Sequence, residues 1–199
     1  MARFLTGLGV CLLWLGLWQA PVWAQGNATH WSDDASQVEA TAKRASRILT
    51  SGTRRCQRLQ PVYRYDCYAQ NYGQAAAALR SAAELQEAQV ILQDVTTALS
   101  QTVTRNADPV APPVRRGRQQ FRAIKPETLP AAKQSFVASL QEAETRLLRS
   151  SSPASLHFTT IAQAINSNKV LLRALLSPVR GIWRRWAGTG ELFGVRYLS

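Results

Sequence analysis

Apolar side chains recur at every third or fourth position through the middle of the chain. The positions of this stripe are Tyr68, Tyr72, Ala75, Leu79, Ala82, Leu85, Ala88, Leu92, Val95, Leu99 and Val103. Because an α-helix turns once in about 3.6 residues, this spacing places all of them on one face. The pattern predicts one long central helix from Pro61 to Val103, about 60 Å long if straight, in which we allow for a bend or a break.

Three shorter segments repeat the helical spacing, over residues 35–51, 127–150 and 153–176. A cap among residues 32–34 is expected to start the first of them, and Gly52 is expected to end it. The inward positions of the three segments, in the same order, are Val38, Ala42, Ala45 and Leu49; Phe136, Val137, Leu140, Ala143, Leu147 and Leu148; and Phe158, Ile161, Ile165, Leu172 and Leu175. The chain is therefore expected to be all-α, a three- to four-helix up-and-down bundle over residues 35–177.

Residues 106–125 interrupt the helical pattern with prolines and basic side chains. Asp108-Pro109 and Pro112-Pro113 oppose regular helix, so we expect an irregular crossover between two helices. Phe121 and Ile124 are expected to fix its far end to the core. The crossover is either an arm for anionic partners or an ordinary solvated connection.

Cys56 and Cys67 lie just before and just after the predicted start of the central helix. In one straight helix their Cα atoms would be about 16 Å apart, whereas a disulfide needs about 5.5 Å. The chain must turn between them, and Gln60-Pro61 is the natural place. We expect a structural disulfide, because redox pairs usually have two intervening residues at a helix start. Neither histidine is near in sequence, which disfavours a metal site.

Residues 1–24 have the layout of a secretory signal peptide, and residues 25–34 form a polar leader. A basic Arg3 precedes the apolar run Phe4–Trp18, and Ala24 is followed by a plausible cleavage point. The expected location is the periplasm or the exterior. The alternative is retention at the inner membrane by an uncleaved N-terminal segment. Cleavage would remove Cys11 and leave an even pair of cysteines in an oxidising compartment.

The net charge is +12, and it falls to +11 if the signal peptide with its single Arg3 is removed. Residues 179–199 form a basic aromatic tail, in which several glycines disfavour a long helix. Tryptophan beside arginine suits the interface between water and lipid head groups, although the tail can equally pack on its own bundle or stay disordered. The candidate anionic-surface contacts are Arg115, Arg116, Arg118, Arg122, Trp183, Arg184, Arg185 and Trp186.

The sequence contains no set of residues that predicts catalysis, cofactor binding or a metal site. Acidic residues are scattered over helix faces, and no serine, histidine and aspartate motif or metal-ligand spacing is present. We therefore expect a non-enzymatic helical bundle of the bacterial envelope that contacts anionic lipid head groups or an acidic partner. The alternative is a periplasmic protein–protein interaction module with incidental charge. The export signal argues against nucleic acid.

The cysteine pair ahead of a predicted long helix is similar to that of other small exported helical proteins of unknown role. The residues behind this similarity are Cys56, Pro61 and Tyr65-Asp66-Cys67. They identify no particular family.

Overall fold

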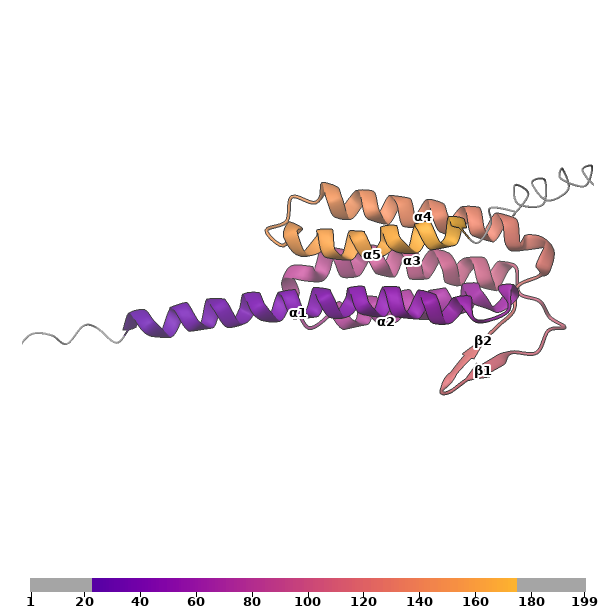
Figure 1. Ribbon diagram of the computed structural model, residues 1–199, viewed down its shortest axis with the longest axis horizontal. Coiled ribbons are helices and arrows are strands. Elements are labelled where there is room, and N and C mark those ends of the chain that lie inside the picture. The colour runs from indigo at the N-terminus through magenta and orange to yellow at the C-terminus, as the bar shows by residue number, and fades with distance from the viewer. Residues whose placement is uncertain (1–22, 175–199) are drawn as a thin grey trace, which may run out of the picture. The chain divides into compact units, whose positions relative to one another are not determined.

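The computed structural model describes the backbone of residues 23–174 and the side chains of residues 34–174 (Figure 1). The helices are α1 (Trp23–Gln57), α2 (Arg64–Leu79), α3 (Gln86–Arg105), α4 (Leu129–Arg149) and α5 (Ser155–Ala174). Short 3-10 turns are Pro61–Tyr63, Ala83–Leu85 and Pro126–Thr128, and the strands are β1 (Val114–Arg116) and β2 (Gln119–Phe121). The predicted signal peptide, apart from its last two residues, and the basic aromatic tail 179–199 lie outside this range.

From Gln37 onward, the helices pack against one another with consecutive helices running in opposite directions (Figure 1). The pairs α2 and α3, α4 and α5, and α3 and α4 are in contact. Helix α1 joins the bundle through Leu49, whose carbonyl accepts hydrogen bonds from Asn71 of α2 (3.2 Å) and Asn168 of α5 (3.3 Å). The mostly helical class is confirmed, whereas the expected three or four helices become five packed helices.

The central helix is broken, so the prediction of one continuous helix from Pro61 to Val103 is wrong. Helix α2 ends at Leu79, Ala82 adopts an extended conformation (φ −127°, ψ 111°), and α3 runs back along α2. The predicted apolar stripe is confirmed, because Tyr72, Leu79, Leu85 and Leu92 are fully buried. Folding back lets the two halves of the stripe bury each other, which a straight helix does not allow.

Gly52 does not end the first helix, contrary to expectation. Helix α1 continues to Gln57, and it already includes residues 32–34, which were expected to cap its start. A Cβ atom at Gly52 would lie 1.6 Å from the amide oxygen of Asn71. This glycine therefore permits close approach of α1 and α2.

The predicted disulfide between Cys56 and Cys67 is present, with a Cα–Cα distance of 5.6 Å. The chain turns where expected, between the end of α1 and Pro61, and both cysteines are buried. The disulfide therefore ties the end of α1 to the first turn of α2.

The crossover is more regular than predicted, because β1 and β2 form an antiparallel hairpin. Val114 pairs with Phe121 and Arg116 with Gln119, which leaves Gly117 and Arg118 as a two-residue loop. Gly117 has a φ of 58°, which glycine adopts without steric cost. As expected, Phe121 and Ile124 are buried and fix the far end of the crossover to the bundle.

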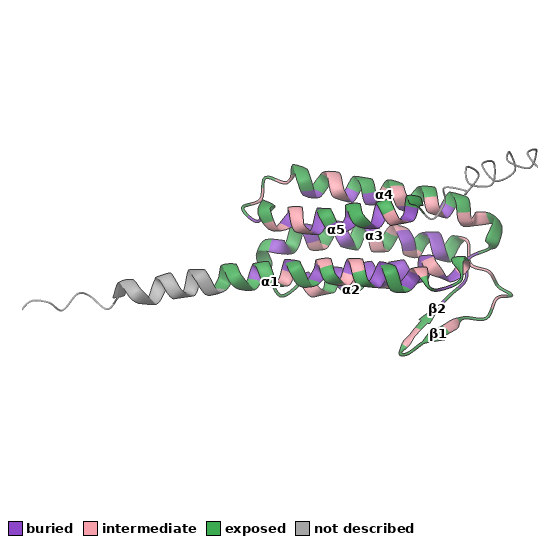
Figure 2. Ribbon diagram, in the orientation of Figure 1, coloured by how far each residue is buried: buried purple, intermediate pink, exposed green. Residues whose placement is uncertain are grey.

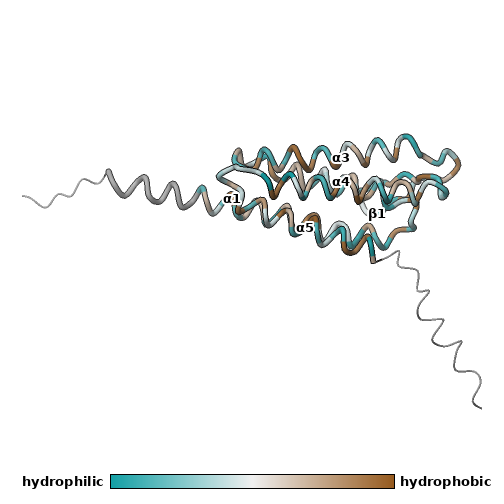
Figure 3. The backbone as a smooth tube through the Cα atoms, turned by 90° about the horizontal axis from the view of Figure 1, so that it is seen from above, coloured by the Kyte–Doolittle hydropathy of each residue, from teal (hydrophilic) through white to brown (hydrophobic). Residues whose placement is uncertain are grey.

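Helices α4 and α5 follow the prediction closely, with their apolar stripes turned inward (Figures 2 and 3). Phe136 lies at the centre of an aromatic cluster: its ring centroid is 5.1 Å from that of Tyr68 and 5.8 Å from that of Tyr72. Leu148 was expected to widen the stripe of α4, but it is 57% exposed because the partner helices lie on the other side. Leu175 lies beyond the described residues.

Candidate functional site

Positive charge gathers at one end of the bundle, which we call the disulfide end. It comprises residues 54–66, residues 105–133 and Arg173 near the end of α5. Its twelve basic residues are Arg54, Arg55, Arg58, Arg64, Arg105, Arg115, Arg116, Arg118, Arg122, Lys125, Lys133 and Arg173, against three acidic residues, Asp66, Asp108 and Glu127. The other residues of 37–174 include seven basic and six acidic ones. The net charge of the described bundle therefore lies almost entirely at the disulfide end.

The hairpin carries three of the predicted contact residues outward. Arg115, Arg116 and Arg118 are exposed, and none of them forms an ion pair with a described residue. The hairpin projects from the side of the bundle at this end (Figure 1). The other predicted group, Trp183, Arg184, Arg185 and Trp186, lies outside the described residues.

Arg122, the fourth predicted contact on the crossover, is held by Asp66 of α2. One carboxylate oxygen of Asp66 accepts the backbone N–H of Arg122 at 2.9 Å, and the other lies 3.2 Å from its guanidinium. Gln70 donates a further hydrogen bond to Asp66 at 3.3 Å and one to the carbonyl of Gln120 at 2.8 Å. Asp66 is buried, so it fixes the base of the hairpin to α2.

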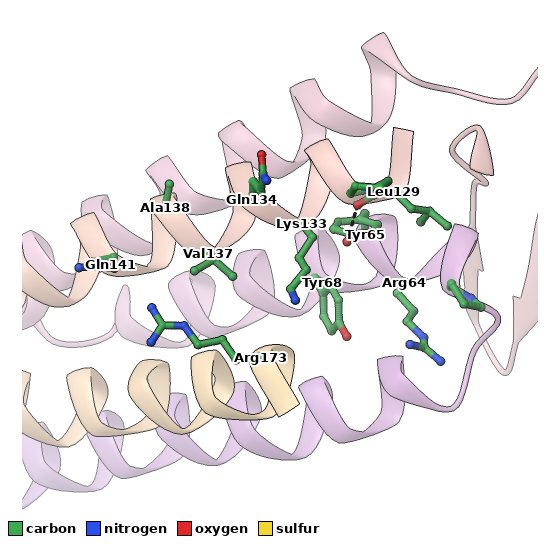
Figure 4. A pocket seen from close by; sticks show the side chains of 12 residues that line it. Arg64, Tyr65, Tyr68, Leu129, Lys133, Gln134, Val137, Ala138, Gln141 and Arg173 are labelled. Carbon is green, nitrogen blue, oxygen red and sulfur yellow. Dashed lines mark hydrogen bonds between the residues drawn. The ribbon is translucent and has the colours of Figure 1, made fainter. Parts of the chain in front are cut away.

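A groove of about 840 Å³ opens at the same end, between the start of α2, the first half of α4 and the end of α5 (Figure 4). Its apolar wall is formed mainly by Tyr65 and Tyr68 from α2 and by Leu129, Val137 and Ala138 from α4. Sequence reasoning missed this groove because its walls come from segments far apart along the chain. No local motif marks it.

Three cationic side chains from three helices line the groove, and no carboxylate does: Arg64, Lys133 and Arg173. Arg64 donates through Nε to the carbonyl of Leu59 at 2.9 Å. Lys133 and Arg173 have no ion-pair partner within residues 34–174. By contrast, the nearby Lys169 of α5 is paired with Glu144 of α4. The groove therefore combines an apolar wall with uncompensated positive charge.

The tyrosines of the groove wall stay protonated well into the alkaline range. Burial raises the pKa of Tyr65 to about 12, and burial also raises the pKa of Tyr68. The hydroxyl of Tyr65 donates to the carbonyl of Leu129 at 3.4 Å. The hydroxyl of Tyr68 is buried and has no hydrogen-bond partner among the described residues. The hydroxyl of Tyr68 is therefore an unpaired donor enclosed by the protein, at a residue that lines the groove.

The described residues include no group of three histidine, cysteine or acidic side chains that could hold a metal ion. None of the described helices is long and apolar enough to cross a lipid bilayer. His157 lies near the start of α5 and is half-buried. Its backbone N–H donates to the carbonyl of Ala154 at 2.8 Å.

Comparison of the chain with models of known protein families, with curated proteins and with solved structures gives no match. The candidate site therefore rests on the geometry and chemistry of this chain alone.

Proposed function

We propose that this chain is an exported, non-enzymatic helical bundle of the bacterial envelope whose disulfide end contacts anionic lipid head groups. The observation that carries the proposal is the charge distribution, with twelve basic and three acidic residues at that end. A concentrated positive field attracts an anionic surface and orients the molecule before contact. The N-terminal segment 1–24, which has the layout of a signal peptide, would direct the chain to the envelope.

The hairpin is the element best suited to make first contact. Arg115, Arg116 and Arg118 lie next to one another around a tight turn, and they are exposed. A basic residue held near an anionic lipid surface contributes about 1 kcal/mol to binding. Three such residues on an element tied to α2 by Asp66 can act together, because their positions relative to the bundle are constrained.

Co-sedimentation of the mature chain with lipid vesicles tests this function. We expect binding to vesicles that contain phosphatidylglycerol and little binding to pure phosphatidylcholine, with a marked loss of binding as the salt concentration rises. The salt effect follows because exposed charges are screened within about 10 Å at 0.1 M salt. Equal binding to both vesicle types, or binding insensitive to salt, would instead favour a protein partner on the bundle surface.

A further inference from the structure

We propose that the groove beside the disulfide end binds a single-chain anionic amphiphile, an alkyl chain that ends in a carboxylate or phosphate. The inference deepens the proposed function, since a protein at an anionic lipid surface meets such molecules. It rests on the groove alone and makes no use of the hairpin. Volumes of about 300 to 1,000 Å³ are typical of small-molecule sites, and this groove falls in that range.

The wall of the groove fits an alkyl chain. Tyr65 and Tyr68 of α2 line it together with Val137 and Ala138 of α4, and Leu129 lies beside Tyr65 at its end (Figure 4). Tyr68 is packed against Phe136, with ring centroids 5.1 Å apart, so this part of the wall is firmly held. Covering the apolar side chains with an alkyl chain removes their surface from water at about 25 cal/mol per Å².

The charges of the groove fit an anionic head group. Arg64, Lys133 and Arg173 line the groove from three different helices and are spread along it, and the lining contains no carboxylate (Figure 4). A groove lined by cations and by no carboxylate has a positive potential, which favours an anionic head group. A cationic or zwitterionic occupant lacks this gain, so the charge of the groove selects the ligand.

The hydroxyl of Tyr68, a residue of the groove wall, is a buried donor without a partner in the part of the chain that the structure describes. Tyr68 is 1% exposed, and its hydroxyl has no partner among the described residues. Unpaired buried donors are uncommon in folded proteins, because the lost hydrogen bond to water is not replaced. In the view of Figure 4, Tyr68 lies between the side chains of Lys133 and Arg64.

The alternative occupant is the segment 175–199 of the same chain, which follows α5 directly and starts near Arg173. Its charged side chains are mostly basic: Arg180, Arg184, Arg185 and Arg196, against Glu191. Placing this segment in a groove that already carries three cations would add to the repulsion. The charge therefore favours a separate anionic ligand.

Isothermal titration of the full mature chain with short-chain amphiphiles, kept below their micelle-forming concentrations, tests the inference. We expect saturable binding of one dodecanoate or dodecyl phosphate per chain. Dodecyltrimethylammonium and dodecyl maltoside, which share the alkyl chain, should not bind, and neither should acetate, which lacks it. Binding that ignores the sign of the head group would overturn the proposal.

Two pairs of variants locate the site. Lys133→Gln with Arg173→Gln should weaken dodecanoate binding roughly tenfold or more, since hydrogen bonds to charged groups contribute about 1.5–3 kcal/mol each. Arg44→Gln with Arg149→Gln removes the same charge from exposed positions elsewhere and should leave binding unchanged. Ala138→Trp should block the groove, whereas Ala131→Trp, at an exposed position of the same helix outside the lining, should not.

The outcomes separate the ligand from the tail and from the proposed function. Absence of dodecanoate binding would overturn the proposal, and a lower melting temperature for Ala138→Trp but not for Ala131→Trp would then assign the groove to the tail. Normal dodecanoate binding by the groove variants, Lys133→Gln with Arg173→Gln and Ala138→Trp, would also overturn it, even if these variants still bind vesicles. Dodecanoate binding in a chain that ignores anionic vesicles would uphold the groove and contradict the proposed function.

Discussion

Asp66 and Arg122 are joined by two hydrogen bonds, one to the backbone N–H of Arg122 at 2.9 Å and one to its guanidinium at 3.2 Å. The carboxylate is buried, whereas the side chain of Arg122 is half-exposed. The contact joins the end of β2 to the first turn of α2. It is therefore the point at which the basic hairpin becomes part of the bundle.

Asp66→Ala should destabilise the protein much more than Arg122→Gln. The first variant leaves the backbone N–H of Arg122 without its acceptor and removes one of the two hydrogen bonds of the Gln70 amide, which costs about 1–3 kcal/mol. The second removes only a partly exposed ion pair, which contributes about 0–1 kcal/mol. Urea unfolding measures both values, and hydrogen exchange of residues 114–121 should be faster in Asp66→Ala alone. Equal losses in the two variants would contradict the role given to the backbone contact.

Gly52 and Gly73 lie inside helices, and replacing them by alanine should have opposite effects. Gly52→Ala drives a Cβ atom into Asn71, whose amide donates to Leu49, so we expect a loss of about 1–3 kcal/mol from overpacking. Gly73→Ala meets only the side chain of Thr96, with its methyl group at 3.4 Å and its hydroxyl at 3.8 Å, and should gain up to about 1 kcal/mol in helix propensity. Thermal unfolding compares them. A stabilised Gly52→Ala variant would mean that α1 and α2 do not approach as described.

Removal of the disulfide should lower the free energy of unfolding by about 3 kcal/mol, because it closes a short loop in the unfolded chain. Denaturant titrations should show similar losses of unfolding free energy for two forms, the double variant Cys56→Ala with Cys67→Ala and the reduced wild-type chain. Both should keep the helical circular dichroism signal at neutral pH. A reduced chain as stable as the oxidised one would show that packing alone sets the turn between α1 and α2.

The buried tyrosines make stability fall at high pH. The pKa of Tyr65 is raised to about 12 in the folded state, above the ordinary value of about 10 in the unfolded chain. A raised pKa contributes stability below about pH 10, and that contribution is lost as the pH rises toward the folded value. Urea titrations above pH 10 should show this decline, and Tyr65→Phe should make it shallower. An identical pH dependence in both proteins would contradict the burial of this hydroxyl.

Much of the bundle follows from local pattern, because apolar spacing reports directly on which helix face is buried. The break after Leu79 does not follow, since Arg80 and Ser81 are ordinary helix residues and only the packing of α2 on α3 favours the reversal. The short strands around Gly117 do not follow either, because the prolines nearby favour irregular structure. Arg64, Lys133 and Arg173 are far apart in sequence, so the fold alone brings them to one groove. Tyr68 beside them belongs to the predicted apolar stripe, and it is buried as expected.

The most direct test of the account compares two triple variants in binding to phosphatidylglycerol vesicles. Arg115→Gln, Arg116→Gln and Arg118→Gln remove three charges from the hairpin, and Arg44→Gln, Arg80→Gln and Arg149→Gln remove three exposed charges from elsewhere on the bundle. We expect the hairpin variant to lose most of its vesicle binding and the control variant to keep nearly all of it. Equal losses in both would mean that only total charge matters and would contradict a lipid-binding disulfide end.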